Sequence, residues 1–86
     1  MPEICRFYGI IISINYDDHN PPHLHADYGS YSVLISIIEL KVLQGKFPNR
    51  GLNLVLDWAK KNQKLLLDNW ELARQGKPLI KIDPLK

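Results

Sequence analysis

Apolar positions at the start of the chain recur with a period of two. Residues 4–16 are mostly β-branched or aromatic, and every second side chain is large and apolar: Tyr8, Ile10, Ile12, Ile14 and Tyr16. This period predicts one long strand with one covered face. Asp17, Asp18, Pro21 and Pro22 lie in the segment of turn formers that follows. We expect that segment to end the strand, because proline cannot donate to a ladder.

A tight hairpin is predicted after the prolines. Apolar and polar side chains alternate over residues 23–28, and Gly29 and Ser30 have the composition of a two-residue turn that begins with glycine. Such a turn fixes the register of its two strands. It pairs Tyr28 with Tyr31, Asp27 with Ser32, Ala26 with Val33, His25 with Leu34, Leu24 with Ile35 and His23 with Ser36.

The second half of the chain changes to a helical period. Residues 39–46 suit a strand or a short turn of helix, and we favour a short fourth strand that closes in a turn at residues 44–46. One helix is predicted over residues 48–75, with Gly76 and Pro78 just past its end. Its main apolar face, spaced at 3.6 residues per turn, contains Leu52, Val55, Leu56, Ala59, Gln63, Leu66, Leu67, Trp70 and Ala73.

These elements predict a single α+β domain over residues 1–86. Residues 4–46 would form an antiparallel sheet of three to four strands around the histidine-containing hairpin, and residues 48–75 one long amphipathic helix. Residues 76–86 would form an extended tail that returns along the domain. The 86 residues, 45% hydrophobic and 23% charged, fit one globular core and argue against the disordered class.

Composition also narrows the location and the partners. Cys5 is the only cysteine, so no internal disulfide can form, which suits a reducing cytoplasm. The N-terminus lacks the apolar run of a signal peptide, and no stretch approaches the roughly 20 apolar residues of a membrane span. We therefore expect a cytoplasmic protein without a membrane partner. The net charge of +2 does not by itself indicate nucleic-acid binding.

Histidine and aspartate side chains gather between residues 17 and 27. Strand geometry puts His23, His25 and Asp27 on one face of the hairpin, and His19 arrives from the adjoining loop. Imidazole and carboxylate ligands suit zinc or another divalent transition metal, and three protein ligands with an open fourth position are the arrangement of catalytic zinc. No cofactor is certain from the sequence, and such a metal at these four residues is the one candidate.

Two other interpretations of the histidines are open. His23 and His25 are candidate catalytic residues, a general base and a general acid for metal-free RNA cleavage, with Arg6 or Arg50 stabilising the developing negative charge. Alternatively, the two prolines set a rigid loop and the histidines hydrogen-bond neighbouring carbonyls and carboxylates. The structural interpretation is the one we favour.

The predicted helix carries a second apolar stripe, roughly opposite the first: Leu54, Trp58, Leu65 and Leu72. One sheet cannot cover both sides, so either the tail folds over this stripe or a protein partner or second subunit covers it. Trp58 would anchor such an interface. Lys60, Lys61 and Lys64 form a basic patch that is a candidate contact for RNA or DNA.

Several short motifs are similar to one bacterial family. They are Arg-Phe-Tyr-Gly at residues 6–9, Asp-His-Asn-Pro-Pro-His-Leu-His-Ala at 18–26, Tyr-Gly at 28–29, Gly-Lys-Phe-Pro at 45–48, Trp-Ala at 58–59 and Asn-Trp at 69–70. Together they resemble the domain-of-unknown-function family numbered four-one-six-zero over nearly the whole chain. The specific part is the string His-Asn-Pro-Pro-His-x-His, to which His19, Pro21, Pro22, His23 and His25 belong.

The resemblance implies a component of a two-gene cassette similar to toxin–antitoxin modules, with a second small protein as its partner. It implies no catalytic residue and no cofactor. We therefore predict a module component that binds a small cognate protein through the second helix stripe, or associates with itself there. The rival prediction is a small nuclease acting on RNA through the histidines, and the third is a nucleic-acid-binding regulator that uses the lysine patch.

Overall fold

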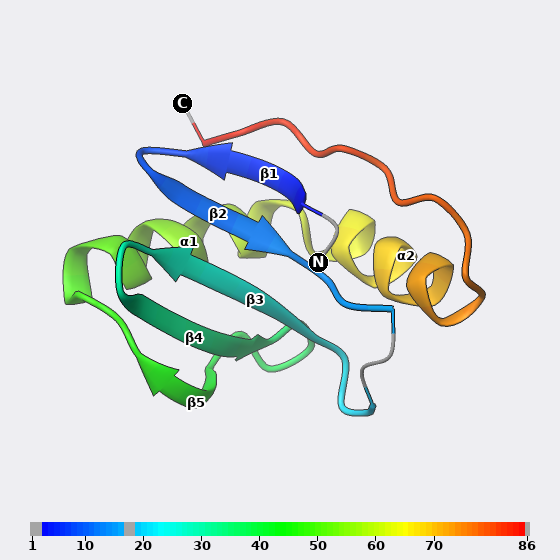
Figure 1. Cartoon of the computed structure of the whole chain (residues 1–86), viewed down its shortest axis with the longest axis horizontal. Coiled ribbons are helices and arrows are strands. Elements are labelled where there is room, and N and C mark those ends of the chain that lie inside the picture. Colours follow the sequence, from blue (N-terminus) through cyan, green and yellow to red (C-terminus); the bar gives the residue numbers. More distant parts are fainter. Residues whose placement is uncertain (1–2, 17–18, 86) are drawn as a thin grey trace.

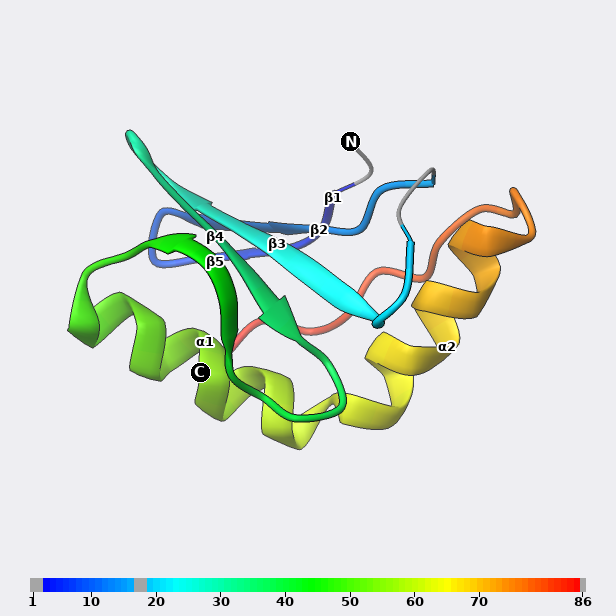
Figure 2. The same ribbon diagram turned by 90° about the horizontal axis from the view of Figure 1, so that it is seen from below.

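The computed structural model describes residues 3–16 and 19–85. Within them, antiparallel strands form one sheet whose spatial order is the order along the chain (Figure 1). The strands are β1 (Glu3–Phe7), β2 (Ile10–Ser13), β3 (His23–Tyr28), β4 (Tyr31–Ser36) and β5 (Val42–Lys46), and the helices are α1 (Asn49–Lys61) and α2 (Gln63–Arg74). Both helices lie on one side of the sheet (Figure 2). The α+β class and the antiparallel sheet are therefore confirmed.

The first predicted strand is wrong in one respect, because the chain folds back inside it. Tyr8 and Gly9 both have positive φ, 51° and 80°, and form a two-residue turn that pairs Phe7 with Ile10. Positive φ at both positions is the type I′ geometry, whose twist matches that of the strands it joins. The period-two pattern hid this turn, since Ile10, Ile12 and Ile14 keep their alternation after it and are all buried.

The central hairpin is as predicted. All the expected pairs between β3 and β4 are present, from Tyr28 opposite Tyr31 to His23 opposite Ser36. Gly29 has positive φ, which suits a turn that begins with glycine. Leu24 and Ala26 are fully buried in the core, whereas His25 and Asp27 on the other side of β3 are half-buried.

The predicted fourth strand exists as β5, but its end was misplaced. The chain turns tightly after β4, where Leu40 N donates to Ser36 O at 2.9 Å, and β5 then continues through residues 44–46, which were predicted as a turn. Gly45 stands opposite Val33 with φ 99°, and a Cβ there would collide with the carbonyl oxygen of Ser32. The glycine therefore permits the close approach of β5 to β4.

The one predicted helix is two helices. Asn62 leaves the helical conformation with φ −119°, and its Nδ2 donates to Trp58 O at 2.8 Å, in competition with the backbone. Gln63 Nε2 donates to Ile37 O at 2.7 Å and so ties the break to the turn after β4. No proline or glycine marks this break, which is why the pattern predicted a single helix. No helix in the described part of the chain is long and apolar enough to cross a bilayer.

The tail after α2 returns along the domain and lies beside β1 (Figure 1). Ile82 N donates to Ile4 O at 2.9 Å, and the Asn69 side chain makes two hydrogen bonds with the backbone of Ile80, each 2.8 Å long. Ile82 is buried with the main core. The core otherwise lies between the sheet and the helices and contains Ile4, Phe7, Ile10, Ile12, Ile14, Leu24, Val33, Ile35, Ile37, Val55, Trp58, Leu66 and Trp70.

Candidate functional site

The first histidine of β3 is buried. His23 is only 9% exposed, and its ring lies against Trp70 of α2 with centroids 5.2 Å apart. Its Nδ1 is 2.9 Å from Pro21 O, and since a carbonyl only accepts, Nδ1 carries the proton of this bond. The prolines thus set the loop whose carbonyl orients the ring, as the structural interpretation expects.

The second histidine lies nearer the surface. The His25 ring is 5.4 Å from that of His23, and its Nε2 is 3.2 Å from Asn15 Nδ2. His25 is half-buried and lines a shallow hollow of about 310 Å³ on the open face of the sheet, with Leu34 and Gln44. We call Asn15, His23, His25 and Trp70 the histidine cluster.

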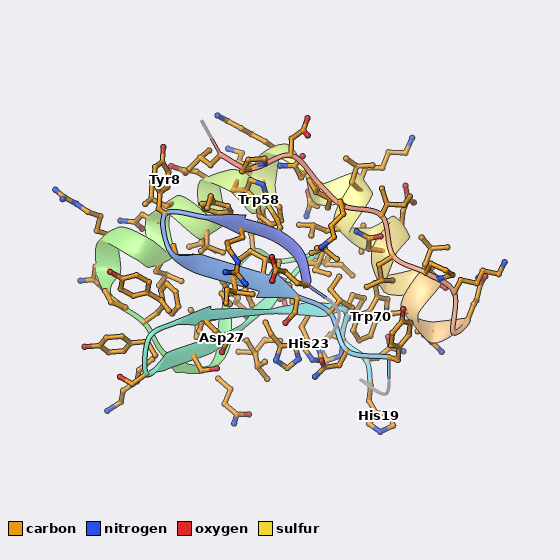
Figure 3. All side chains as sticks on the ribbon, turned by 45° about the horizontal axis from the view of Figure 1, so that its top comes forward. Tyr8, His19, His23, Asp27, Trp58 and Trp70 are labelled. Carbon is orange, nitrogen blue, oxygen red and sulfur yellow. The ribbon has the colours of Figure 1, made fainter. Side chains whose placement is uncertain are left out.

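The four predicted metal ligands are not brought together. His19 is exposed and lies well away from His23 in Figure 3. Asp27 lies near the other end of β3, where it accepts a hydrogen bond of 2.6 Å from Ser32 Oγ. Among residues 3–16 and 19–85, no three His, Cys, Asp or Glu side chains could share a metal ion. Asp17 and Asp18, predicted as turn residues, lie outside the described residues.

Two buried polar atoms in the histidine cluster lack a protein partner within the described part of the chain. They are Asn15 Oδ1 and Trp70 Nε1. Unpaired polar atoms are expensive to bury, and small buried waters commonly satisfy them. The cluster thus combines these two buried polar atoms with the half-buried His25, which lines the hollow on the open sheet face.

Among the described residues, no hydrogen bond or ion pair joins either candidate arginine to the histidines. Arg6 on β1 donates to both carboxylate oxygens of Glu3, at 3.2 and 2.9 Å. This hydrogen bond is the main reason that the pKa of Glu3 is lowered, and it raises the pKa of Arg6. Arg50 stands in the first turn of α1, beside the hairpin turns at the other end of β3. The arrangement thus favours the structural role of the histidines over paired acid–base catalysis.

The second helix stripe is largely covered. Trp58 is 1% exposed, packs on Phe7 with ring centroids 5.5 Å apart, and donates from Nε1 to Asp83 O of the tail at 2.8 Å. Leu54 and Leu72 are half-buried, and only Leu65 is exposed, at 42%. Of the two predicted alternatives, the structure thus has the tail over Trp58. A buried Trp58 cannot anchor a partner without moving the tail.

The lysine patch and the cysteine occupy different surroundings. Lys60, Lys61 and Lys64 are exposed around the break between α1 and α2, and their contact with nucleic acid stays a prediction. Cys5 is buried in β1, and burial raises the pKa of its thiol. A buried thiol with a raised pKa is a poor nucleophile, so Cys5 has the properties of an ordinary core residue.

The exposed edge of the sheet is a feature that the sequence pattern missed. All five residues of β5 are exposed, whereas the opposite edge, β1, is bonded to the tail. Val42 and Leu43 on β5 and Ile38 in the preceding turn expose large apolar side chains. The available signal was the segment Leu-Lys-Val-Leu at residues 40–43, which was ambiguous between strand and helix.

Comparison with known proteins gives one family. The family described as "Domain of unknown function (DUF4160)" matches residues 9–71, most of the chain. The match confirms the resemblance to this family. No curated protein and no solved structure matches the chain significantly.

Proposed function

Since this chain belongs to the family described as "Domain of unknown function (DUF4160)", we propose its function from its own surface: it binds a small protein partner along β5, as one component of a toxin–antitoxin-like module. The two-protein arrangement is what the family resemblance implies, and it is part of the proposal. The binding mode is the addition of a strand from the partner to the free edge of the sheet.

The observation that carries this proposal is the free edge. β5 pairs with β4 on one side, and its five residues are all exposed. The outer side of an edge strand presents unpaired N–H and C=O groups, which are a template for another chain. Strand addition uses these backbone groups for affinity and alternate side chains for specificity.

Side chains around the edge favour one specific partner. Val42, Leu43 and Ile38 supply exposed apolar area, which a partner strand would cover. Lys46 and the positive-φ Gly45 at the end of the strand oppose indiscriminate pairing, since charge and local distortion are the usual protection of an edge. A partner that fits residues 42–44 would therefore be selected over unrelated chains.

Two leucines of similar exposure test the location of the interface. Leu43 on β5 is 39% exposed and Leu65 on α2 is 42% exposed, so Leu43→Lys and Leu65→Lys are matched variants of the edge and of the helix stripe. The chain would be co-expressed with the small protein encoded by the adjacent gene, and the complex measured by size exclusion with light scattering. We expect Leu43→Lys to weaken the complex at least about tenfold, the effect of losing one interface hot spot, and Leu65→Lys to leave it unchanged.

Other outcomes have definite meanings. Loss of the complex with Leu65→Lys alone would place the interface on the helix stripe. A homodimer that Leu43→Lys dissociates would make the edge a self-association surface. The module proposal would be overturned if the chain stays monomeric, forms no complex, and is neither toxic when expressed nor protective against the adjacent gene product.

A second proposal, RNA cleavage at the histidine cluster, is favoured by one observation: His25 lines the hollow on the open sheet face. His25 would transfer the proton, and His23 would fix its position through the ring contact of 5.4 Å. His25→Ala should then abolish cleavage of a short RNA and cost no more than the ordinary value of one hydrogen bond, about 1 kcal/mol. Unchanged cleavage in this variant would end the proposal.

A further inference from the structure

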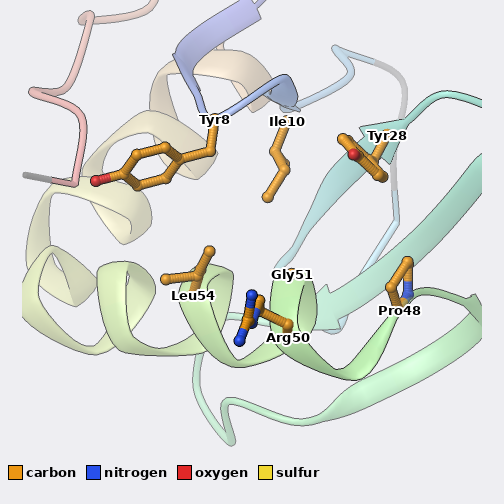
Figure 4. Close-up of a pocket in the computed structure, with 7 residues that line it drawn as sticks. All are labelled: Tyr8, Ile10, Tyr28, Pro48, Arg50, Gly51 and Leu54. Carbon is orange, nitrogen blue, oxygen red and sulfur yellow. The ribbon is translucent and has the colours of Figure 1, made fainter.

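A pocket of about 370 Å³ lies at the end of the sheet opposite the histidine cluster. Figure 4 shows Tyr8 and Tyr28 on either side of Ile10, with Leu54 and Arg50 facing them from α1. Gly51 and Pro48 complete the lining. We call this the tyrosine pocket. It joins the turn between β1 and β2, the end of β3 and the first turns of α1.

Tyr8 occupies a backbone conformation that suits other residues better. Its φ is 51°, in the left-handed region, and a type I′ turn prefers asparagine, aspartate or glycine at this position. Its side chain is 61% exposed, so burial does not explain the choice of tyrosine. Strain of this kind is often retained where a side chain serves a function. The Tyr8 ring makes an edge-to-face contact with Phe7, with centroids 6.1 Å apart, and its exposed side forms one wall of the pocket.

Two glycines leave room for the aromatic rings around the pocket. A Cβ on Gly9 would come within 3.2 Å of Tyr28 Cε1, and a Cβ on Gly51 would come within 3.0 Å of Phe47 Cε2. Phe47 in turn supports Tyr28, with ring centroids 6.2 Å apart. Gly51 also weakens the first turns of α1, a cost that a larger residue would avoid. The tight packing behind the pocket therefore depends on both glycines.

Size and charge limit what the pocket can bind. About 370 Å³ is near the lower end of small-molecule sites, roughly 300–1,000 Å³, which suits one large side chain. Its lining is apolar or aromatic apart from Arg50, and no acidic residue is among the lining residues. A nucleobase would need several polar groups for its edge, and the side chains of the lining offer only tyrosine hydroxyls and one guanidinium. An apolar side chain next to a carboxylate fits better, because tyrosine and arginine are the typical anchors of such contacts.

We propose that the tyrosine pocket binds a large apolar side chain of the partner protein, flanked by acidic residues that pair with Arg50. This inference takes from the proposed function only that the ligand is a protein. It adds a second contact, which follows β5 closely in the chain because Pro48 lies two residues after Lys46.

The test uses the full chain, labelled with ¹⁵N, and two short probes. Acetyl-Glu-Trp-Glu-amide and acetyl-Lys-Trp-Lys-amide present the same apolar side chain with opposite flanking charge. We expect the acidic peptide to shift the amide signals of Gly9, Arg50 and Gly51 and to bind at least about fivefold more tightly than the basic one, since charge pairing at an exposed rim is modest. Adenosine monophosphate is the third ligand. If adenosine monophosphate binds more tightly than either peptide, the ligand of the pocket is a nucleotide and the proposal is overturned.

Variants separate binding from folding. Tyr8→Asn installs the preferred turn residue but loses the ring contact with Phe7, so its unfolding midpoint should stay close to that of the parent. Its peptide affinity should fall about tenfold, as for a hot-spot residue. Arg50→Glu should reverse the preference between the two peptides. Tyr16→Asn is the matched control, because Tyr16 is exposed and does not line the pocket, and it should bind as the parent does. Equal affinity for both peptides, or full affinity in Tyr8→Asn, would overturn the proposal.

The same probes distinguish this inference from the proposed function. Leu43→Lys should lose the partner complex and keep the peptide affinity, since Leu43 does not line the pocket. A complex that forms while no peptide binds would refute the pocket alone. Peptide binding without any complex would refute the module proposal and leave the pocket as a peptide site.

Discussion

At the end of the sheet where β3 begins, His23 is wedged between Trp70 and His25; where β3 ends, Tyr28 and the nearby Tyr8 stand exposed around an open pocket. Histidine is the residue usually associated with chemistry near neutral pH, yet here its position is set by packing and by a loop carbonyl. Tyrosines on a strand pair are usually packing residues, yet here they remain accessible. Accessibility, more than residue type, therefore identifies the surface available to a ligand.

The enclosed end is tested most strongly by Trp70→Ala. Trp70 is 1% exposed, and truncating a buried tryptophan costs about 3–5 kcal/mol. We expect most of the unfolding free energy of this small domain to be lost, as measured by urea denaturation. A cost below about 1 kcal/mol would mean that the enclosed end contributes little to the fold, and the contrast between the two ends would fail.

The histidines themselves provide a matched pair. His23→Ala removes a buried ring and the hydrogen bond to Pro21 O, which should cost about 1–3 kcal/mol. His19→Ala, at an exposed position of the same loop, should stay within about 0.5 kcal/mol of the parent. Equal small costs at both positions would argue against the structural role of His23.

At the open end, Tyr28→Ala should be well tolerated. Tyr28 pairs with Tyr31 across the hairpin and also contacts the Phe47 ring; a cross-strand pair contributes roughly 0.2–1 kcal/mol and an aromatic pair about 0.5–1.5 kcal/mol. We expect a loss of about 1–2 kcal/mol in the same urea experiment, together with weaker binding of the acidic peptide. A loss as large as that of Trp70→Ala would show that the open end is structural as well.

The smallest effect concerns Cys5, which stands opposite Ile12 in the middle of β1 and β2 and reports on both ends. Burial raises the pKa of its thiol, so the folded state favours the neutral form. This contribution to stability is present below the ordinary thiol pKa and is lost as the pH rises through the raised value. At mildly alkaline pH a thiol reagent should label native Cys5 at least about tenfold more slowly than free cysteine. Trp70→Ala should accelerate labelling more than Tyr28→Ala, and the reverse order would contradict the comparison.

Local pattern predicted the parts of the fold that local physics decides. The register from Tyr28–Tyr31 to His23–Ser36 follows from one glycine turn and a period of two, and no distant contact was needed. The buried positions Val55, Ala59, Leu66, Trp70 and Ala73 were all predicted from their helical spacing. For the candidate site, the sequence predicted that His23 and His25 share a face and correctly favoured hydrogen bonding to a carbonyl.

Tertiary structure decided the rest, because the deciding interactions join residues far apart in the chain. Gln63 reaches Ile37 and so stabilises a helix break that no proline or glycine marks. Asp83 O accepts the Trp58 indole hydrogen, which turns a predicted interface anchor into core. The turn at Tyr8 and Gly9 was not predicted, because the period of two continues through it and tyrosine is not a typical turn residue. The sequence by itself thus determined the elements and most of their buried faces, while long-range hydrogen bonds and packing determined which faces stayed accessible.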